Sequence, residues 1–248
     1  MNNFLEIKQL SKTYYTELGS VEALNNINLE VREGEILGIV GTSGCGKSTL
    51  LSIISKLDKD YDGVVSSNDK SDYVVGYMLQ EDALFPWLTI LDNAILGLKI
   101  KKIDNDDNIE YVKKLLETYG LKDFMYKYPS SLSGGMKQRV ALIRTLAIKP
   151  DILLLDEPFS KLDLITRLDI SDDVYSIIKK EKKTTIIISH DIGECVSLCD
   201  RVAIMSKRPG TIKSVYDINL LNKNIPSKNR LDEKFYYYYD ILWKDIDK

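Results

Sequence analysis

The sequence predicts an α/β fold with a parallel sheet at its centre. Three short runs, at 35–40, 151–156 and 184–189, are apolar at successive positions. Such runs are typical of strands that helices cover on both faces, whereas alternation marks a half-exposed strand. Apolar stripes at helical spacing lie between the runs, from Ile109 to Tyr119 and from Met136 to Ala147.

The remaining elements follow from local patterns. The first 33 residues alternate apolar and polar side chains, as in FLEIKQL, and predict an antiparallel β lobe. Gly120 and Pro150 are expected to end the two helices that precede them. The polar stretch KKIDNDDN at 101–108 predicts a surface turn, and the aromatic tail at 234–248 predicts a terminal amphipathic helix.

The composition suits one large domain, or one domain with an inserted lobe. The chain has 248 residues and a net charge of −3, so no overall basic field would recruit nucleic acid. No apolar run approaches the roughly 20 residues that span a bilayer. The charged N-terminus does not resemble a secretory signal. Cys45, Cys195 and Cys199 form no zinc pattern, and reduced thiols in a cytoplasmic protein are expected.

The stretch GTSGCGKST at 41–49 matches the phosphate-binding pattern G-x-x-x-x-G-K-[ST]. It follows a predicted strand and precedes a predicted helix, as such a loop requires, and it indicates a P-loop NTPase core of the RecA-like type. Lys47 is expected to reach the β- and γ-phosphates, and Ser48 to offer its hydroxyl to Mg²⁺. The residues expected to bind the nucleotide here are Gly41, Thr42, Ser43, Gly44, Cys45, Gly46, Lys47, Ser48 and Thr49.

A pair of carboxylates ends the run ILLLDEP at 152–158. A carboxylate at the end of a buried strand is costly unless a cation or hydrogen bonds meet it. Asp156 is therefore expected to hold Mg²⁺, and Glu157 to polarise the water that attacks the γ-phosphate. A solvated strand end is the structural alternative, and the phosphate loop argues against it.

Between these two motifs lies LSGGMKQR at 132–139, where Ser133 can cap a helix beginning at Gly134. With this stretch, nearly the whole chain resembles the nucleotide-binding subunits of ATP-binding cassette (ABC) transporters. The resemblance implies a single ABC ATPase domain over 1–248, with a helical lobe at about 84–147 inserted between the nucleotide motifs. It also implies a head-to-tail pair of cassettes, in which Ser133, Gly134 and Gly135 close over the partner's ATP.

The resemblance implies further site residues. Gln80 matches the glutamine that reaches the metal and the attacking water, and Tyr14 matches the aromatic residue that stacks on adenine, with Tyr15 as the alternative. In SKLD at 160–163, Lys161 replaces the family's usual alanine, while Asp163 is retained.

The chain contains one histidine, His190, at the end of the third apolar run. It matches the family's switch histidine, whose ring can reach the γ-phosphate. The expected catalytic residues are Glu157, His190, Gln80 and Lys47, and the expected metal ligands are Ser48, Gln80 and Asp156.

The stretches LFPWLTILDN, DEPFSKLDLITR and MSKRPGTI resemble importer cassettes of the nitrate, sulfonate and taurine group, which includes cassettes for thiamine pyrimidine precursors. The resemblance implies an ATPase that energises uptake of a small solute, at the cytoplasmic face of the membrane. The expected partners are a second, identical cassette, permease subunits and, indirectly, a solute-binding protein, but no nucleic acid. The residues at 84–87 are expected to meet the permease or to pack inside the helical lobe, and both roles can hold for different residues. The alternative function is a non-import cassette that remodels membranes, releases lipoproteins or acts on DNA or the ribosome.

Overall fold

The computed structural model describes residues 3–17, 19–67, 72–221 and 223–247. Its central sheet has six strands in the order β5-β6-β7-β3-β8-β9, and every neighbouring pair is parallel except β8 and β9. The strands are β3 (Ile36–Val40), β5 (Val75–Met78), β6 (Ile152–Asp156), β7 (Thr184–Ile188), β8 (Arg201–Met205) and β9 (Ile212–Asp217). The three apolar runs are therefore strands β3, β6 and β7, and the predicted α/β class is confirmed.

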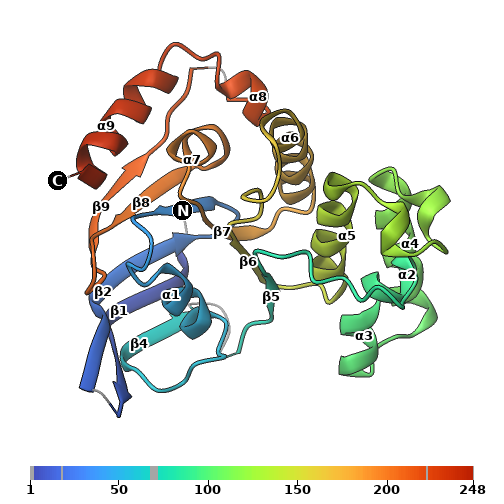
Figure 1. Cartoon of the computed structure of the whole chain (residues 1–248), viewed down its shortest axis with the longest axis horizontal. Coiled ribbons are helices and arrows are strands. Elements are labelled where there is room, and N and C mark those ends of the chain that lie inside the picture. The colour runs from blue at the N-terminus through green and yellow to red at the C-terminus, as the bar shows by residue number, and fades with distance from the viewer. Residues whose placement is uncertain (1–2, 18, 68–71, 222, 248) are drawn as a thin grey trace.

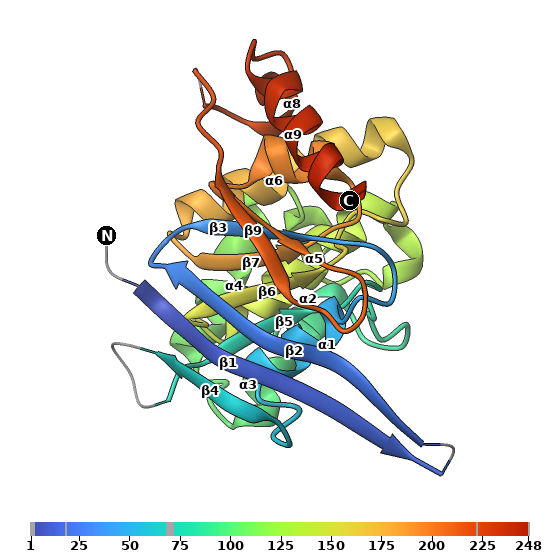
Figure 2. The same cartoon turned by 90° about the vertical axis from the view of Figure 1, so that its left-hand side faces the viewer.

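A second sheet of three antiparallel strands has the order β2-β1-β4. It consists of β1 (Asn3–Thr16), β2 (Gly19–Arg32) and β4 (Asp62–Ser67). β1 and β2 form a long hairpin, which runs across the front of the molecule in Figure 2. This is the expected N-terminal antiparallel lobe, in which Leu5, Ile7 and Leu10 point into the core.

Helices cover the central sheet and form a separate group to one side of it (Figure 1). Helix α1 lies between the two sheets, and α2 to α5 gather on the right of the view. The helices are α1 (Lys47–Ile54), α2 (Ile90–Ala94), α3 (Leu96–Lys101), α4 (Asp106–Thr118), α5 (Gly134–Ala147), α6 (Leu164–Lys180), α7 (Ile192–Leu198), α8 (Pro226–Asn229) and α9 (Phe235–Asp247), with short 3₁₀ turns at Lys122–Phe124 and Pro129–Ser131.

The helical predictions hold with one correction. α4, α5 and α9 lie where the apolar stripes predicted them, and Gly120 has the positive φ of 75° that suits a helix end. The polar stretch at 101–108 is only partly a turn, because Lys101 ends α3 and α4 already begins at Asp106. The Asn105 side chain accepts a hydrogen bond from Asn108 N at 2.9 Å and caps α4, which explains why a polar sequence starts a helix there.

The three cysteine side chains are buried in the core. Cys195 and Cys199 pack against Gly38 of β3, where an added Cβ would lie 2.8 Å from Cys199 Sγ. The two sulfurs therefore fill the space between α7 and the sheet. In the described part of the chain, no helix is both long enough and apolar enough to cross a membrane.

Candidate ATPase site

The phosphate loop connects the buried end of β3 to the N-terminus of α1. Gly44 and Gly46 have φ values of 73° and 106°, which favour glycine. A Cβ on Gly46 would also lie 2.7 Å from Leu24 Cδ2. Lys47 Nζ donates to the Gly41 carbonyl at 2.8 Å, so the lysine side chain folds over the loop that precedes it. The loop therefore presents a preformed concave backbone with a cation at its centre.

A cavity of about 290 Å³ opens beside this loop. Its lining residues are Tyr14, Val21, Ala23, Ser43, Gly44, Gly46, Lys47, Ser48, Thr49, Glu157 and Arg208. The fold thus brings Tyr14, from a different sheet, to the phosphate loop. Tyr15 is 83% exposed and does not line the cavity, which separates the two tyrosine candidates. Gly41, Thr42 and Cys45 do not line it either: Gly41 and Cys45 pack inward, and Thr42 offers its carbonyl to Lys47.

Asp156 ends β6 close to the loop. Burial raises the pKa of its carboxyl, although hydrogen bonds from Tyr77 and Ser48 and the charge of Lys47 act in the opposite direction. The Tyr77 hydroxyl lies 3.3 Å from Asp156 Oδ2, and burial together with this carboxylate raises the pKa of Tyr77 to about 12. The Asp156 carboxylate and the Ser48 hydroxyl are hard oxygen ligands of the kind that Mg²⁺ prefers.

The described residues contain no cluster of three or more His, Cys, Asp or Glu side chains that could hold a metal. Mg²⁺ commonly binds through one or two protein oxygens together with substrate phosphates and waters. The pair formed by Ser48 and Asp156 therefore fits Mg²⁺ delivered with a nucleotide.

Glu157 is the centre of a polar network. His190 Nδ1 lies 3.2 Å from Glu157 Oε2, and Gln80 Nε2 donates to the same oxygen at 3.1 Å. Gln80 Nε2 also lies 3.3 Å from Ser160 Oγ, which in turn donates to the Glu157 carbonyl at 3.0 Å. Gln80 and His190, from two segments that are far apart in sequence, thus converge on one carboxylate.

The backbone at Glu157 supports this arrangement. Its φ is 46°, in the left-handed region that residues other than glycine rarely adopt, and its N–H donates to the Ile188 carbonyl at 2.9 Å. Strained conformations of this kind gather at functional sites because the surrounding structure imposes them. The turn places the Glu157 side chain beside the end of β7, from which His190 follows.

A buried hydrogen-bond chain lies behind His190. Ser189 Oγ donates to Glu194 Oε2 at 2.6 Å and accepts from Asp191 N at 3.0 Å. Burial raises the pKa of Glu194. These contacts fix the backbone on both sides of the histidine, whose own side chain is 58% exposed.

The LSGG stretch lies elsewhere on the molecule. Ser133 is the N-cap of α5 and accepts from Met136 N at 3.3 Å, as predicted. Ser133 and Gly134 are exposed, but none of Ser133, Gly134 and Gly135 lines the cavity beside the phosphate loop. Gly135 is buried and packs closely against α6, since an added Cβ would lie 2.5 Å from Ile170 Cδ1. This helix end therefore lies outside the cavity beside the chain's own phosphate loop.

Arg208 is a cavity residue that the sequence analysis did not single out for a role. It belongs to the loop between β8 and β9, which Gly210 attaches to β2 through its N–H to the Ala23 carbonyl at 2.9 Å. The stretch KRPG carries a turn signal, but no local pattern shows that the turn reaches the phosphate loop. The contact depends on the packing of β2 against the end of the central sheet.

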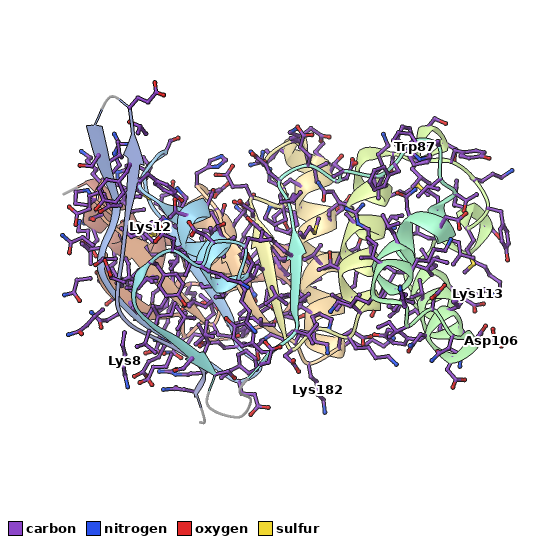
Figure 3. All side chains as sticks on the ribbon, turned by 90° about the horizontal axis from the view of Figure 1, so that it is seen from below. Lys8, Lys12, Trp87, Asp106, Lys113 and Lys182 are labelled. Atoms are coloured by element: carbon purple, nitrogen blue, oxygen red, sulfur yellow. The ribbon has the colours of Figure 1, made fainter. Side chains whose placement is uncertain are left out.

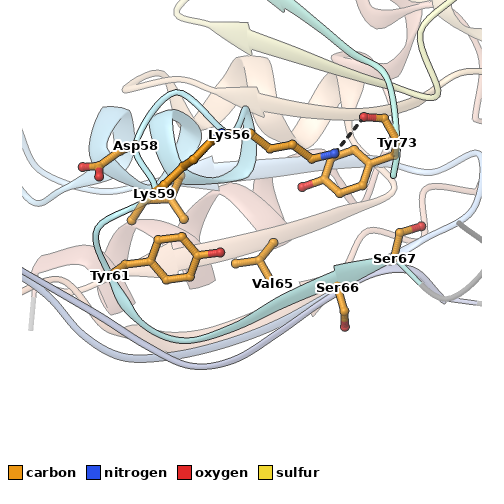
Figure 4. Close-up of a pocket in the computed structure, with 9 residues that line it drawn as sticks. Lys56, Asp58, Lys59, Tyr61, Val65, Ser66, Ser67 and Tyr73 are labelled. Atoms are coloured by element: carbon orange, nitrogen blue, oxygen red, sulfur yellow. Dashed lines mark hydrogen bonds between the residues drawn. The ribbon is translucent and has the colours of Figure 1, made fainter. Parts of the chain in front are cut away.

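A larger cavity, of about 430 Å³, lies near the C-terminal end of α1, where Ile53 and Lys56 line it (Figure 4). Lys56 donates there to the Tyr73 carbonyl at 3.1 Å, and its Nζ lies 3.9 Å from the centre of the Tyr73 ring. None of the predicted site residues lines this cavity. Size alone would therefore point to the wrong place, whereas the converging polar groups identify the smaller cavity.

Comparison with known proteins identifies the family of the chain. A model of the family described as ABC transporter matches residues 24–160. YtlC of Bacillus subtilis, named an uncharacterized ABC transporter ATP-binding protein, is 38% identical over 99% of this chain and 96% of its own length. SsuB of Bacillus anthracis, an aliphatic sulfonates import ATP-binding protein, is 40% identical over 87% of this chain and 86% of its own.

Two further matches extend the comparison. NrtD of a Synechocystis strain, a nitrate import ATP-binding protein, is 38% identical over 95% of this chain and 92% of its own. A solved structure of the ATP-binding cassette MJ0796, described as a dimeric post-hydrolysis state bound to ADP and Pi, superposes with a TM-score of 0.72 at 31% identity. It covers 87% of this chain and 99% of that one. This chain therefore belongs to the ABC transporter family, as an ATP-binding subunit with the ATPase cassette fold.

Proposed function

We propose that the chain energises an importer for a small solute as one of two cassettes bound to permease subunits at the cytoplasmic face of the membrane. The observation that carries the proposal is an exposed aromatic pair, which follows Gln80 in the chain by a few residues. Phe85 and Trp87 are 38% and 69% exposed, and their rings lie 5.2 Å apart. Exposed aromatic clusters of this kind mark interaction surfaces.

The two expectations for this segment apply to different residues. Leu84 packs against the hydrophobic core, whereas Trp87 faces solvent at the end of the molecule opposite to Lys8 (Figure 3). Residues 84–87 lie directly beyond Gln80 in the chain, so a partner on Trp87 is connected to the ATPase site by a short piece of backbone. The import functions named for SsuB and NrtD support a permease as this partner.

Two observations support a pair of cassettes. Ser133 and Gly134 lie exposed at the positive end of α5, outside the chain's own cavity. The solved cassette with the same fold is dimeric. In a head-to-tail pair, each α5 end would face the phosphates bound by the other chain, so that closure would complete two sites.

Each side chain then has a stated task in hydrolysis. Tyr14 offers its ring to adenine, and the loop N–H groups with Lys47 bind the phosphates. Ser48, Asp156 and Gln80 would hold Mg²⁺ through oxygen atoms, and the ion would supply positive charge that offsets the charge developing on phosphate. Glu157 polarises the attacking water, and His190 donates to phosphate oxygen while it contacts Glu157.

The test uses a Glu157→Gln chain, in which the amide cannot accept a proton from water but ATP binding and closure are retained. We would tag this variant, add ATP and Mg²⁺, solubilise native membranes gently, and identify what co-purifies. A multi-span permease with a solute-binding protein is the expected result. Recovery of ribosomes, of nucleic acid or of no membrane protein would contradict the import proposal.

The chain offers a matched control, because it contains two tryptophans and both are exposed. Trp87→Ala in the Glu157→Gln background should lose the permease, whereas Trp243→Ala on α9 should retain it. Equal recovery of the permease by both variants would show that the surface around Trp87 is not the docking site.

A further inference from the structure

Two consecutive residues that follow β5 contact two consecutive residues that precede α6. Gln80 Nε2 lies 3.3 Å from Ser160 Oγ, and Glu81, the next residue, forms an ion pair with Lys161, the residue after Ser160. The two segments therefore contact each other through a polar pair and a charged pair in register. Lys161 is also the position where this chain departs from the alanine that its family usually carries.

The segment that contains Gln80 is anchored mainly to the helical group, through Asn93 and Arg144. It is irregular backbone from residue 79 to residue 89, before α2 begins. On the side of the helical group, Arg144 donates to the Asp82 and Ala83 carbonyls at 2.6 and 2.8 Å. On the side of the central sheet, the hydrogen bonds of Gln80 and the ion pair of Glu81 hold this segment.

The orientation of the Gln80 amide depends on this anchoring. Its nitrogen donates to Glu157 Oε2 at 3.1 Å, so the amide oxygen faces away from that carboxylate. A shift of the segment would break this hydrogen bond and turn the amide, because a glutamine side chain in an irregular loop has several accessible rotamers. Catalytic groups lose activity when they are displaced by about 1 Å.

We propose that Glu81 and Lys161 are positioning residues that hold the Gln80 amide on Glu157 during ATP hydrolysis. The inference rests on the roles proposed above for Gln80 and Glu157. The pair acts through Gln80 and does not touch the nucleotide cavity. Its loss should reduce the rate of hydrolysis without weakening ATP binding.

The expected effect is modest because both partners are well exposed. The side chains of Lys161 and Glu81 are 54% and 73% accessible, so water and salt screen their attraction. A pair of this kind changes an equilibrium, and hence the fraction of correctly placed Gln80, by about twofold to fivefold. We therefore expect kcat to fall by about twofold to fivefold with an unchanged KM for ATP.

The experiment compares Lys161→Ala, Glu81→Ala and the charge-exchanged double variant Glu81→Lys/Lys161→Glu in the purified full chain. Steady-state ATPase activity gives kcat and KM at low and high salt. Hydrogen exchange of a peptide that covers residues 79–83 gives a readout independent of turnover. Each single variant should show lower kcat and faster exchange, the exchanged pair should restore both, and high salt should bring the wild type to the level of Lys161→Ala.

A matched control is the exposed ion pair between Glu117 of α4 and Lys122 of the following 3₁₀ turn, with side chains 53% and 66% accessible. Lys122→Ala should leave kcat, its salt dependence and the exchange of 79–83 unchanged. The proposal is overturned if Lys161→Ala keeps or raises kcat, or if exchanging the charges fails to restore it. Gln80→Ala separates the two levels of the argument: if it leaves kcat intact, the role of Gln80 itself is wrong, whatever the ion pair does.

Discussion

His190 and Glu157 follow the ends of neighbouring parallel strands, and their side chains meet with Nδ1 3.2 Å from Oε2. Because the register of β6 and β7 sets this distance, the contact is a property of the sheet rather than of a flexible loop. The ring is 58% exposed, so it can face a phosphate on one side while it contacts the carboxylate on the other.

His190→Ala should therefore reduce hydrolysis and leave binding intact. We expect kcat to fall by about 100-fold, in the range for loss of a positioned proton donor, with ATP affinity within about twofold of the wild type. Steady-state kinetics and a separate titration with a fluorescent ATP analogue measure the two quantities. A raised KM with normal kcat would instead mean that the ring only binds substrate.

Asp156→Asn should stabilise the chain while it impairs metal-dependent turnover. Burial raises the pKa of this carboxyl, so at neutral pH its ionised form lowers the free energy of unfolding. Removal of the charge should raise Tm by about 2–4 °C, since about 1 kcal/mol corresponds to that shift in a chain of this size. Calorimetry with EDTA and without nucleotide measures it, and an unchanged or lower Tm would refute the explanation.

Arg208→Ala should weaken nucleotide binding. The guanidinium lines the cavity beside the phosphate loop, and a lost charge-assisted contact at an exposed site should raise the Kd for ATP by about threefold or more. The neighbouring Lys207 is exposed and does not line the cavity, so Lys207→Ala is a matched control for the loss of one positive charge. Equal effects of the two variants would indicate only long-range electrostatics.

Asp200 should make the stability of the chain depend on pH. It lies where β3 and β8 begin, at the end of the central sheet opposite to the phosphate loop. Its carboxylate accepts from Ile36 N and lies within 2.8 Å of both Lys179 and Lys223. Burial alone would raise the pKa of Asp200, but the two lysines and the hydrogen bonds lower it below its ordinary value. The folded state therefore favours the ionised form.

The sign of the effect follows from this direction. The stabilisation is fully present above the unfolded pKa of about 4 and is lost as pH falls through the lowered folded pKa. Asp200→Asn should cost about 2 kcal/mol at neutral pH, and the difference from wild type should shrink below about pH 4. Urea unfolding at several pH values tests it; a difference that grows on acidification would give the opposite sign.

The elements that could be predicted from sequence are those with strong local patterns. β3, β6 and β7 are mostly apolar and buried along almost their whole length because helices or the second sheet cover both of their faces, and α5 combines a serine cap with a clear stripe. The start of α4 was less predictable, because its first turn is polar and depends on the Asn105 cap.

The site residues also differ in whether a local sequence pattern reveals them. The phosphate loop and the pair Asp156–Glu157 have sequence motifs, and the resemblance located Gln80, Tyr14 and His190. Arg208 and Tyr77 have no such signal, since each reaches the site only through contacts between strands that are distant in sequence. The ion pair of Lys161 was also hidden, because its partner lies 80 residues away.

The burial of all three cysteines has a practical consequence for spectroscopy. Cys45, Cys195 and Cys199 are at most 1% exposed, and contact with Cys199 and burial raise the pKa of Cys195, so the native thiols should react slowly with maleimides. A single cysteine introduced at an exposed position could therefore carry a spin label or a fluorophore without removal of any native one. Distances between labelled chains could then be followed through a whole cycle of nucleotide binding and release.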